Sequence, residues 1–265
     1  MGRYDWISLT TDYGLSDGFV AVCHGVIAKI APRVRVIDVT HQVAPGDIAR
    51  GAAVLAQAVP YLPRSVHIAV VDPGVGTSRR AIAIEAVNGI LVGPDNGVLW
   101  PAAQAMGGIV RTVELTEASW FSPVVSATFH GRDIFAPAGA RLARGADLGA
   151  GGPAADPNSL IRLPDPIINL GEGWLDAEVR SIDRYGNVQL AARGEHLTDL
   201  GEHLRVGSMP AQRMTTFGDV PLGSLVVFVD SAGHTSIGIN GGRAVVALSV
   251  KPGDIVRIAS AQPLP

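Results

Sequence analysis

The chain has 265 residues, of which 47% are hydrophobic and 17% charged, and its formal net charge is -3 at pH 7. This length and this apolar content suffice for one large domain or two modest ones, and they exclude a disordered chain. The weakly acidic balance gives no long-range attraction for nucleic acid or for an anionic membrane, so neither is expected as a partner. No stretch is apolar for long enough to span a bilayer.

Cysteine usage indicates a reducing compartment. Cys23 is the only cysteine, so the chain cannot form an internal disulfide, and a cytoplasmic location is expected. Its neighbours Val20, Val22 and Val26 are apolar, which predicts a small buried hydrophobe rather than a nucleophile.

Strand-like and helix-like segments alternate through the first half of the chain. The Asn88-Gly89 pair predicts a hairpin between two of the strands. Such alternation is typical of an α/β domain with a largely parallel sheet, here assigned to residues 1–155. The expected strands are 6–11, 34–39, 66–71, 81–86, 90–92 and 109–115, and the expected helices are 17–30, 47–57 and about 133–144.

The pattern changes in the second half. Residues 145–166 are dense in Gly, Pro, Ala and Asp without periodicity, which predicts a linker. Short strands with turn residues between them follow, and they predict a small β-barrel or sandwich domain over 166–265. These expected strands are 174–190, 203–206, 225–229, 234–239, 244–250 and 254–258.

Three aspartates stand where apolar strands of the first half end. They are Asp12, Asp72 and Asp95. Ligands of open α/β sheets bind at the carboxyl ends of the strands, so carboxylates there can hold a metal, orient sugar hydroxyls or act as bases. Each one taken alone is at least as readily the cap of a turn or helix.

A glycine-rich loop, Asp-Pro-Gly-Val-Gly-Thr at 72–77, permits close approach of backbone to a ligand. The missing third glycine and Pro73 exclude a dinucleotide fingerprint. The chain has no phosphate-binding P-loop, no nucleophile elbow and no Cys or His pair at zinc spacing, so neither a metal nor a cofactor is expected. Arg79 and His130, taken singly, fit a solvated charge and a buried histidine as well as they fit catalysis.

Together these segments are far more specific. This chain resembles the S-adenosylmethionine hydroxide adenosyltransferases, which are relatives of the fluorinase and chlorinase enzymes, and the resemblance covers essentially the whole chain. The segments that carry it, in order, are TTDYG at 10–14, IDVTH at 37–41, VDPGVG at 71–76, GPDNG at 93–97, FHGRD at 129–133, DRYGN at 183–187 and Asp230-Ser231.

The resemblance implies an α/β amino half and a β-barrel carboxyl half. It also implies a homotrimer in which substrate binds between the first domain of one subunit and the second domain of its neighbour. The family's catalytic set falls on Asp72, Arg79 and His130, and its ribose-binding aspartate on Asp12.

The resemblance places further contacts in the second domain. Asp183, Asn187 and Ser231 match positions that bind the methionine portion and the adenine. The expected activity is hydrolysis of S-adenosylmethionine to adenosine and methionine by water attack, with S-adenosylmethionine as a substrate and no cofactor. Whether Asp72 or His130 receives the proton is open at this stage.

Two alternatives remain. The first is a halogenase that forms a 5'-halo-5'-deoxyadenosine. A carboxylate at Asp72 would repel a halide in the nucleophile slot, and Gly131 stands where the fluorinase has a serine, so water is the expected nucleophile. The second alternative is a non-catalytic protein that binds an adenosyl ligand without turning it over.

Overall fold

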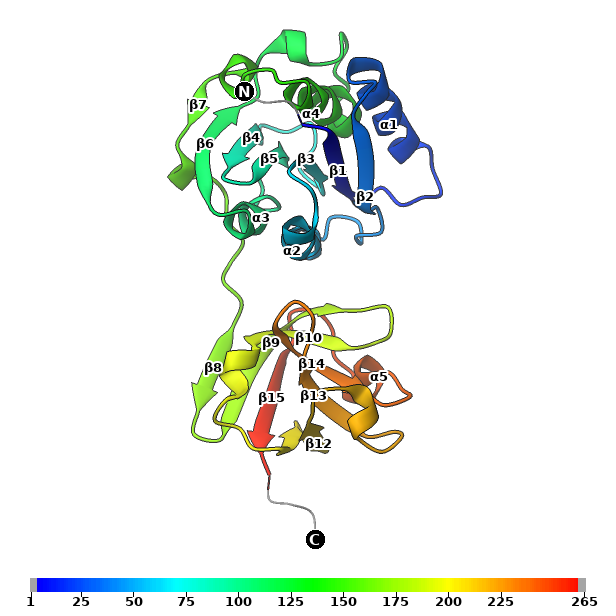
Figure 1. The fold of residues 1–265 in the computed structure, drawn as a ribbon, viewed down its shortest axis with the longest axis vertical. Coiled ribbons are helices and arrows are strands. Elements are labelled where there is room, and N and C mark those ends of the chain that lie inside the picture. The colour runs from blue at the N-terminus through cyan, green and yellow to red at the C-terminus, as the bar shows by residue number, and fades with distance from the viewer. Residues whose placement is uncertain (1–3, 262–265) are drawn as a thin grey trace. The chain divides into compact units, whose positions relative to one another are not determined.

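The computed structural model describes residues 4–261, and the chain forms two compact units, the first ending at Leu163 and the second beginning at Pro164 (Figure 1). Part of the Gly- and Pro-rich segment 145–166 is folded onto the first unit. Strand β7 (Ala154–Ala155) pairs with the sheet of that unit, and Leu160 is buried.

The first unit is built on one mixed sheet. Its strand order is β2-β1-β3-β5-β4-β6-β7. Strands β2, β1, β3 and β5 run parallel, and β4, β6 and β7 continue the sheet in antiparallel fashion. The strands are β1 (Trp6–Thr11), β2 (Arg35–Thr40), β3 (Ser65–Val70), β4 (Ala81–Ala86), β5 (Gly89–Pro94) and β6 (Ile109–Glu114).

Helices cover both faces of this sheet. The helices α1 (Phe19–Ile30) and α4 (Ala136–Ala143) lie on one face, and α2 (Ile48–Ala58) and α3 (Trp100–Ala105) lie on the other (Figure 1). Each face of the sheet has its own apolar core, and burial of those side chains holds the helices against the sheet on both sides. None of the helices within residues 4–261 is both long and apolar enough to cross a membrane.

Two local features of these helices matter for the site. Asp47 caps α2, because its side chain accepts a hydrogen bond of 2.9 Å from the backbone N–H of Arg50. One turn of π-helix, Gly131–Phe135, precedes α4 and begins directly after His130. Such wide turns are frequent at functional sites.

Cys23 on α1 is buried, as predicted, and burial raises the pKa of its thiol to about 12.

The second unit is a β-barrel. Strand β10 pairs with both β14 and β9, and this double pairing closes a ring of seven strands with no free edge, while β8 extends from β9. Every second residue of β9 faces the barrel core. The strands are β8 (Ile168–Gly171), β9 (Trp174–Ile182), β10 (Val188–Arg193), β11 (His203–Val206), β12 (Met209–Arg213), β13 (Leu225–Val229), β14 (His234–Ile239) and β15 (Ile255–Ser260).

The predicted fold, an α/β domain followed by a β-barrel, is confirmed, and two local expectations are corrected. Segment 244–250 is not a strand, because its first residues form helix α5 (Ala244–Leu248). The apolar run was too short for its period to be read. The segment 174–190 is two strands, with a turn over 183–187. The elements α3, β7, β8 and β12 were not predicted from the sequence.

Candidate active site

A buried ion pair closes the glycine-rich loop, because Asp72 is its first residue, just after β3, and Arg79 follows its last residue. The Nε–H of Arg79 donates to both carboxylate oxygens of Asp72, at 3.1 and 3.0 Å, and Nη2 donates to Oδ2 as well. The Asp72 side chain is 4% exposed and the Arg79 side chain 10%. Because the two charges are almost wholly removed from water, removal of either partner would leave a costly unpaired charge.

The same guanidinium reaches His130. Arg79 Nη2 lies 2.7 Å from His130 Nδ1. A guanidinium offers only donors, so Nδ1 must accept, and the imidazole is therefore neutral with its proton on Nε2. Burial and the positive charge of Arg79 both lower the pKa of His130, in agreement with this neutral state. The structure thus brings all three predicted catalytic residues into one hydrogen-bonded chain.

Close backbone packing holds the loop and His130 in place. Gly76 has a φ of +76°, and a Cβ there would collide with the carbonyl oxygen of Ala127, three residues before His130. Only glycine fits this combination of left-handed backbone and contact. On the other side, the Arg79 guanidinium lies 5.1 Å from the centre of the Phe135 ring, a cation–π contact.

Tyr13 also borders the site, although no role was predicted for it from the sequence. A Cβ at Gly131 would overlap the Tyr13 hydroxyl, so no side chain fits at position 131 while Tyr13 keeps its place. The Tyr13 ring packs edge-on against Phe129, with 5.6 Å between ring centres. Burial raises the pKa of Tyr13 well above its ordinary value, so its hydroxyl stays protonated. The TTDYG segment already contained this residue.

Asp12 follows β1 and is partly exposed. Its Oδ2 accepts a hydrogen bond of 2.8 Å from the backbone N–H of Gly46. Its Oδ1 accepts none from the residues that the structure describes, which leaves it free for a ligand hydroxyl. Asp95 differs, because Arg80 donates to its Oδ2 at 2.9 Å and the N–H of Ile161 to its Oδ1, also at 2.9 Å. Asp95 therefore fastens the end of the first unit and is no free carboxylate.

In the second unit, Asp183 and Asn187 lie together in the turn between β9 and β10. Asp183 Oδ1 accepts from the backbone N–H groups of Tyr185 and Asn187, at 2.8 Å each, and Oδ2 accepts from Asn187 Nδ2 at 2.7 Å. Both oxygens of Asp183 are thus engaged in the turn itself. Asn187 Oδ1 accepts no hydrogen bond within residues 4–261, and it faces the backbone of Gly238.

Ser231 lies in a different turn, the one that follows β13. Its neighbour Asp230 orders that turn, because Oδ1 accepts from the backbone N–H groups of Ala232 and His234 at 2.9 and 3.0 Å. This turn precedes the first residue of β14, whereas Asn187 lies beside the far part of the same strand, at Gly238. The structure therefore spaces Ser231 and Asn187 along the barrel and does not cluster them.

Comparison with protein families assigns both units. The SAM hydroxide adenosyltransferase N-terminal domain matches residues 7–152, and the SAM hydroxide adenosyltransferase C-terminal domain matches residues 177–257. The chain belongs to this family.

Individual relatives cover the chain from end to end. An (R)-S-adenosyl-L-methionine hydrolase of Salinispora tropica is 60% identical over 98% of this chain and 100% of its own length. A fluorinase of Actinoplanes sp. is 25% identical over 96% of this chain and 97% of its own length. The crystal structure of an uncharacterized conserved protein from Thermotoga maritima superimposes with a TM-score of 0.88 at 36% identity, covering 96% of this chain and 99% of that one.

The neutral state of His130 predicts its titration. Burial and Arg79 disfavour the imidazolium, so His130 should gain a proton only below the ordinary histidine pKa of about 6.5. The proton would take the Nδ1 lone pair and break the contact with Arg79. Proton–nitrogen correlation spectra of the histidine side chains measure the midpoint, and His130→Gln assigns the signal. An Arg79→Met variant should move the midpoint upward, and a wild-type midpoint above 6.5 would contradict the arrangement.

Proposed function

We propose that this chain hydrolyses (R)-S-adenosyl-L-methionine to adenosine and L-methionine. The observation that carries the proposal is the Asp72–Arg79–His130 chain at the carboxyl end of β3, in a protein 60% identical over its full length to a hydrolase of that substrate. The open end of a parallel sheet is where ligands of such folds bind.

In this reaction the leaving group departs without help from a catalytic acid. Water attacks C5' of the ribose, a C5'–O bond forms, and the C5'–S electron pair leaves with sulfur. The sulfonium becomes a neutral thioether, so no general acid is needed. The enzyme has to orient a water molecule in line with the C5'–S bond and to accept its proton.

Asp72 is the proton acceptor in this account. Each carboxylate oxygen has lone pairs beyond those that Arg79 occupies, so Asp72 can still accept a hydrogen bond from the attacking water. His130 cannot act as the base in this state, since its Nδ1 already accepts from Arg79 and its Nε2 carries a proton. We therefore assign proton acceptance to Asp72.

Arg79 and His130 position and polarise the nucleophile. Of the five guanidinium N–H groups, those on Nε and Nη2 are engaged by Asp72 and His130, and the two on Nη1 make no hydrogen bond within residues 4–261. These two donors can stabilise the growing negative charge on the water oxygen, while His130 fixes the orientation of the guanidinium that carries them. In a dry site such donors act strongly because they are already oriented.

The ion pair changes the reason for preferring water to a halide. Repulsion by Asp72 alone is weaker than the sequence suggests, because Arg79 neutralises the carboxylate. Selectivity comes instead from the lone pairs of Asp72: water can donate a hydrogen bond to them, and a halide ion cannot. Gly131 adds to this, since the Tyr13 hydroxyl leaves no room there for the side chain of a serine.

Binding residues come from both units. Asp12 holds the ribose hydroxyls through Oδ1, and Asn187 accepts a hydrogen bond from the adenine amino group through its free Oδ1. Asp183 acts indirectly: it accepts a hydrogen bond from the Asn187 side chain and so holds Asn187 in position within the β9–β10 turn. Ser231 contacts the methionine portion.

The assembly and its location complete the proposal. The resemblance to the family supports a homotrimer in which each substrate lies between the first unit of one subunit and the second unit of the next. A single cysteine, itself buried, supports a cytoplasmic location.

Turnover in ¹⁸O-labelled water tests the reaction. The label should appear on the 5'-oxygen of adenosine and not in methionine, and the epimer with R configuration at sulfur should be consumed faster than the S epimer. Parallel reactions in high chloride and high fluoride should give the same adenosine. Unlabelled adenosine, a 5'-halo product, or binding without turnover would each contradict water attack.

Variants of the two aspartates should separate chemistry from binding. Asp72→Asn keeps the shape beside Arg79 but weakens proton acceptance, so kcat should fall by about 10² to 10⁴ with little change in KM. Asp12→Asn should mainly raise KM, because the ribose hydroxyls are present in ground and transition states alike. Steady-state kinetics and thermal unfolding of both proteins provide the check. If Asp72→Asn turned over like the wild type, Asp72 would not be the acceptor.

Mixed trimers test the shared site. Asp72→Asn disables only the first unit and Asn187→Ala only the second, so each variant alone should be inactive or nearly so. After the two are mixed, unfolded and refolded together, about a quarter of the sites should combine two intact units if subunits associate at random. Activity should therefore return to about that fraction. No recovery in mixed trimers would show that each site lies within one subunit.

A further inference from the structure

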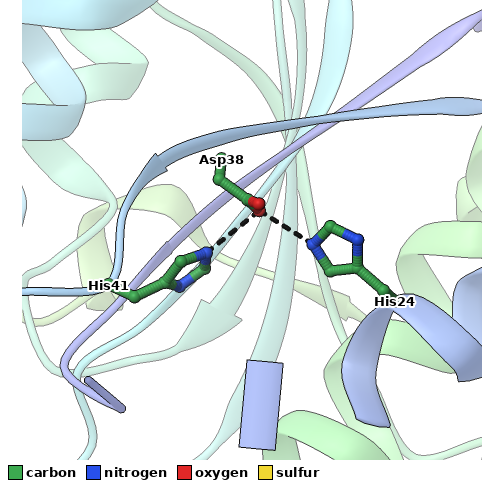
Figure 2. A group of neighbouring side chains, drawn as sticks. All are labelled: His24, Asp38 and His41. Atoms are coloured by element: carbon green, nitrogen blue, oxygen red, sulfur yellow. Dashed lines mark hydrogen bonds and ion pairs between the residues drawn. The ribbon is translucent and has the colours of Figure 1, made fainter. Parts of the chain in front are cut away.

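Outside the hydrolytic site, three side chains with metal-ligating atoms converge on one point. Figure 2 shows His24 from α1, Asp38 from β2 and His41 from the loop after β2. His24 Nε2 lies 2.9 Å and His41 Nε2 3.0 Å from the same oxygen, Asp38 Oδ1. All three ligand atoms lie within 4.8 Å of one another.

The surroundings of His41 leave one of its nitrogens without a hydrogen bond. Its side chain is 3% exposed, and Nε2 is buried without a hydrogen bond, although Asp38 Oδ1 is close. Its Nδ1 lies 2.8 Å from Thr11 Oγ1, which also accepts from the backbone N–H of Tyr13 at 3.2 Å. In the tautomer that carries its proton on Nδ1, Thr11 Oγ1 accepts that proton and Nε2 keeps the lone pair that a metal ion requires. The lone pair then lies beside Asp38 Oδ1 without being engaged by any hydrogen bond among the described residues.

We propose that His24 Nε2, Asp38 Oδ1 and His41 Nε2 bind a divalent transition-metal ion of the zinc class. Tetrahedral zinc with bonds of about 2.0–2.1 Å keeps its ligand atoms roughly 3.3 Å apart. The two histidine–aspartate separations are a few tenths of an ångström shorter than this, so small side-chain rotations make room for the ion.

The donor set selects the class of metal. Two imidazoles and one carboxylate suit zinc and its transition-metal neighbours, whereas magnesium and calcium prefer sets made of oxygen alone. The side chains of His24 and Asp38 are 35% and 40% exposed, which gives the ion a path in and leaves a position for water. Thr11 holds the Nδ1 side of His41, the kind of outer contact that orients metal-bound histidines.

The ion would fasten the loops beside the substrate. The backbone carbonyl of His41 accepts a hydrogen bond of 2.7 Å from the N–H of Gly14, and Thr11 directly precedes Asp12. Ligands on α1, on β2 and in the following loop would thus be tied to the segment that presents Asp12. The ion takes no part in the hydrolysis, and its expected effect is on the stability of the first unit.

Zinc titration of tag-free, chelator-treated full-length protein tests the proposal. We expect one zinc ion per chain by elemental analysis after dialysis, a rise in Tm with zinc but not with magnesium, and visible absorption bands of a tetrahedral site with cobalt. His24→Ala and the nearly isosteric Asp38→Asn should each weaken zinc binding at least about 100-fold, since a lost ligand costs no less than a lost outer contact.

The control is His203→Ala, which removes an exposed histidine of the second unit and should bind zinc like the wild type. Zinc affinity unchanged in both His24→Ala and Asp38→Asn would overturn the assignment, and so would the absence of stoichiometric zinc and of cobalt bands in the wild type. In that case the three side chains would form an ion-paired cluster only.

Discussion

The guanidinium of Arg79 donates to the Asp72 carboxylate on one side and to the His130 imidazole on the other, and the site depends on this double contact. In a nearly waterless position, Asp72 has a cationic partner that donates to both of its oxygens. His130 stays neutral because its Nδ1 must accept from a group that has no lone pair to offer. Without Arg79, the buried Asp72 carboxylate would lose the cation that pairs with it.

The fold delivers these groups from separate elements. Asp72 comes from the end of β3, Arg79 from the far side of the glycine loop, and His130 from the start of a π-helical turn. Two glycines make the approach possible: Gly76 fits against the backbone of Ala127, and Gly131 fits against Tyr13. The site therefore depends on the absence of side chains at these two positions as much as on its charged groups.

Sequence patterns were sufficient to predict those elements whose signal lies within a few neighbouring residues. The apolar runs of the first sheet and the hairpin between β4 and β5 are readable because strands and tight turns impose short periods, although the turn lies at Val87-Asn88 and Gly89 begins β5. Asp183 shows the limit, since only the structure reveals that both its oxygens serve the turn. The approach of His24 to Asp38 was also unreadable, because a helix and a parallel strand bring them together without motif spacing. The helical turn at α5 was missed because its apolar run is too short to show a period.

Neutron diffraction from deuterium-exchanged crystals tests the central claim most directly, because it locates the protons around Arg79. The account predicts deuterium on Nε2 and none on Nδ1 of His130, no deuterium on Asp72, and a fully deuterated guanidinium between them. Deuterium on His130 Nδ1, or on a carboxylate oxygen of Asp72, would contradict it.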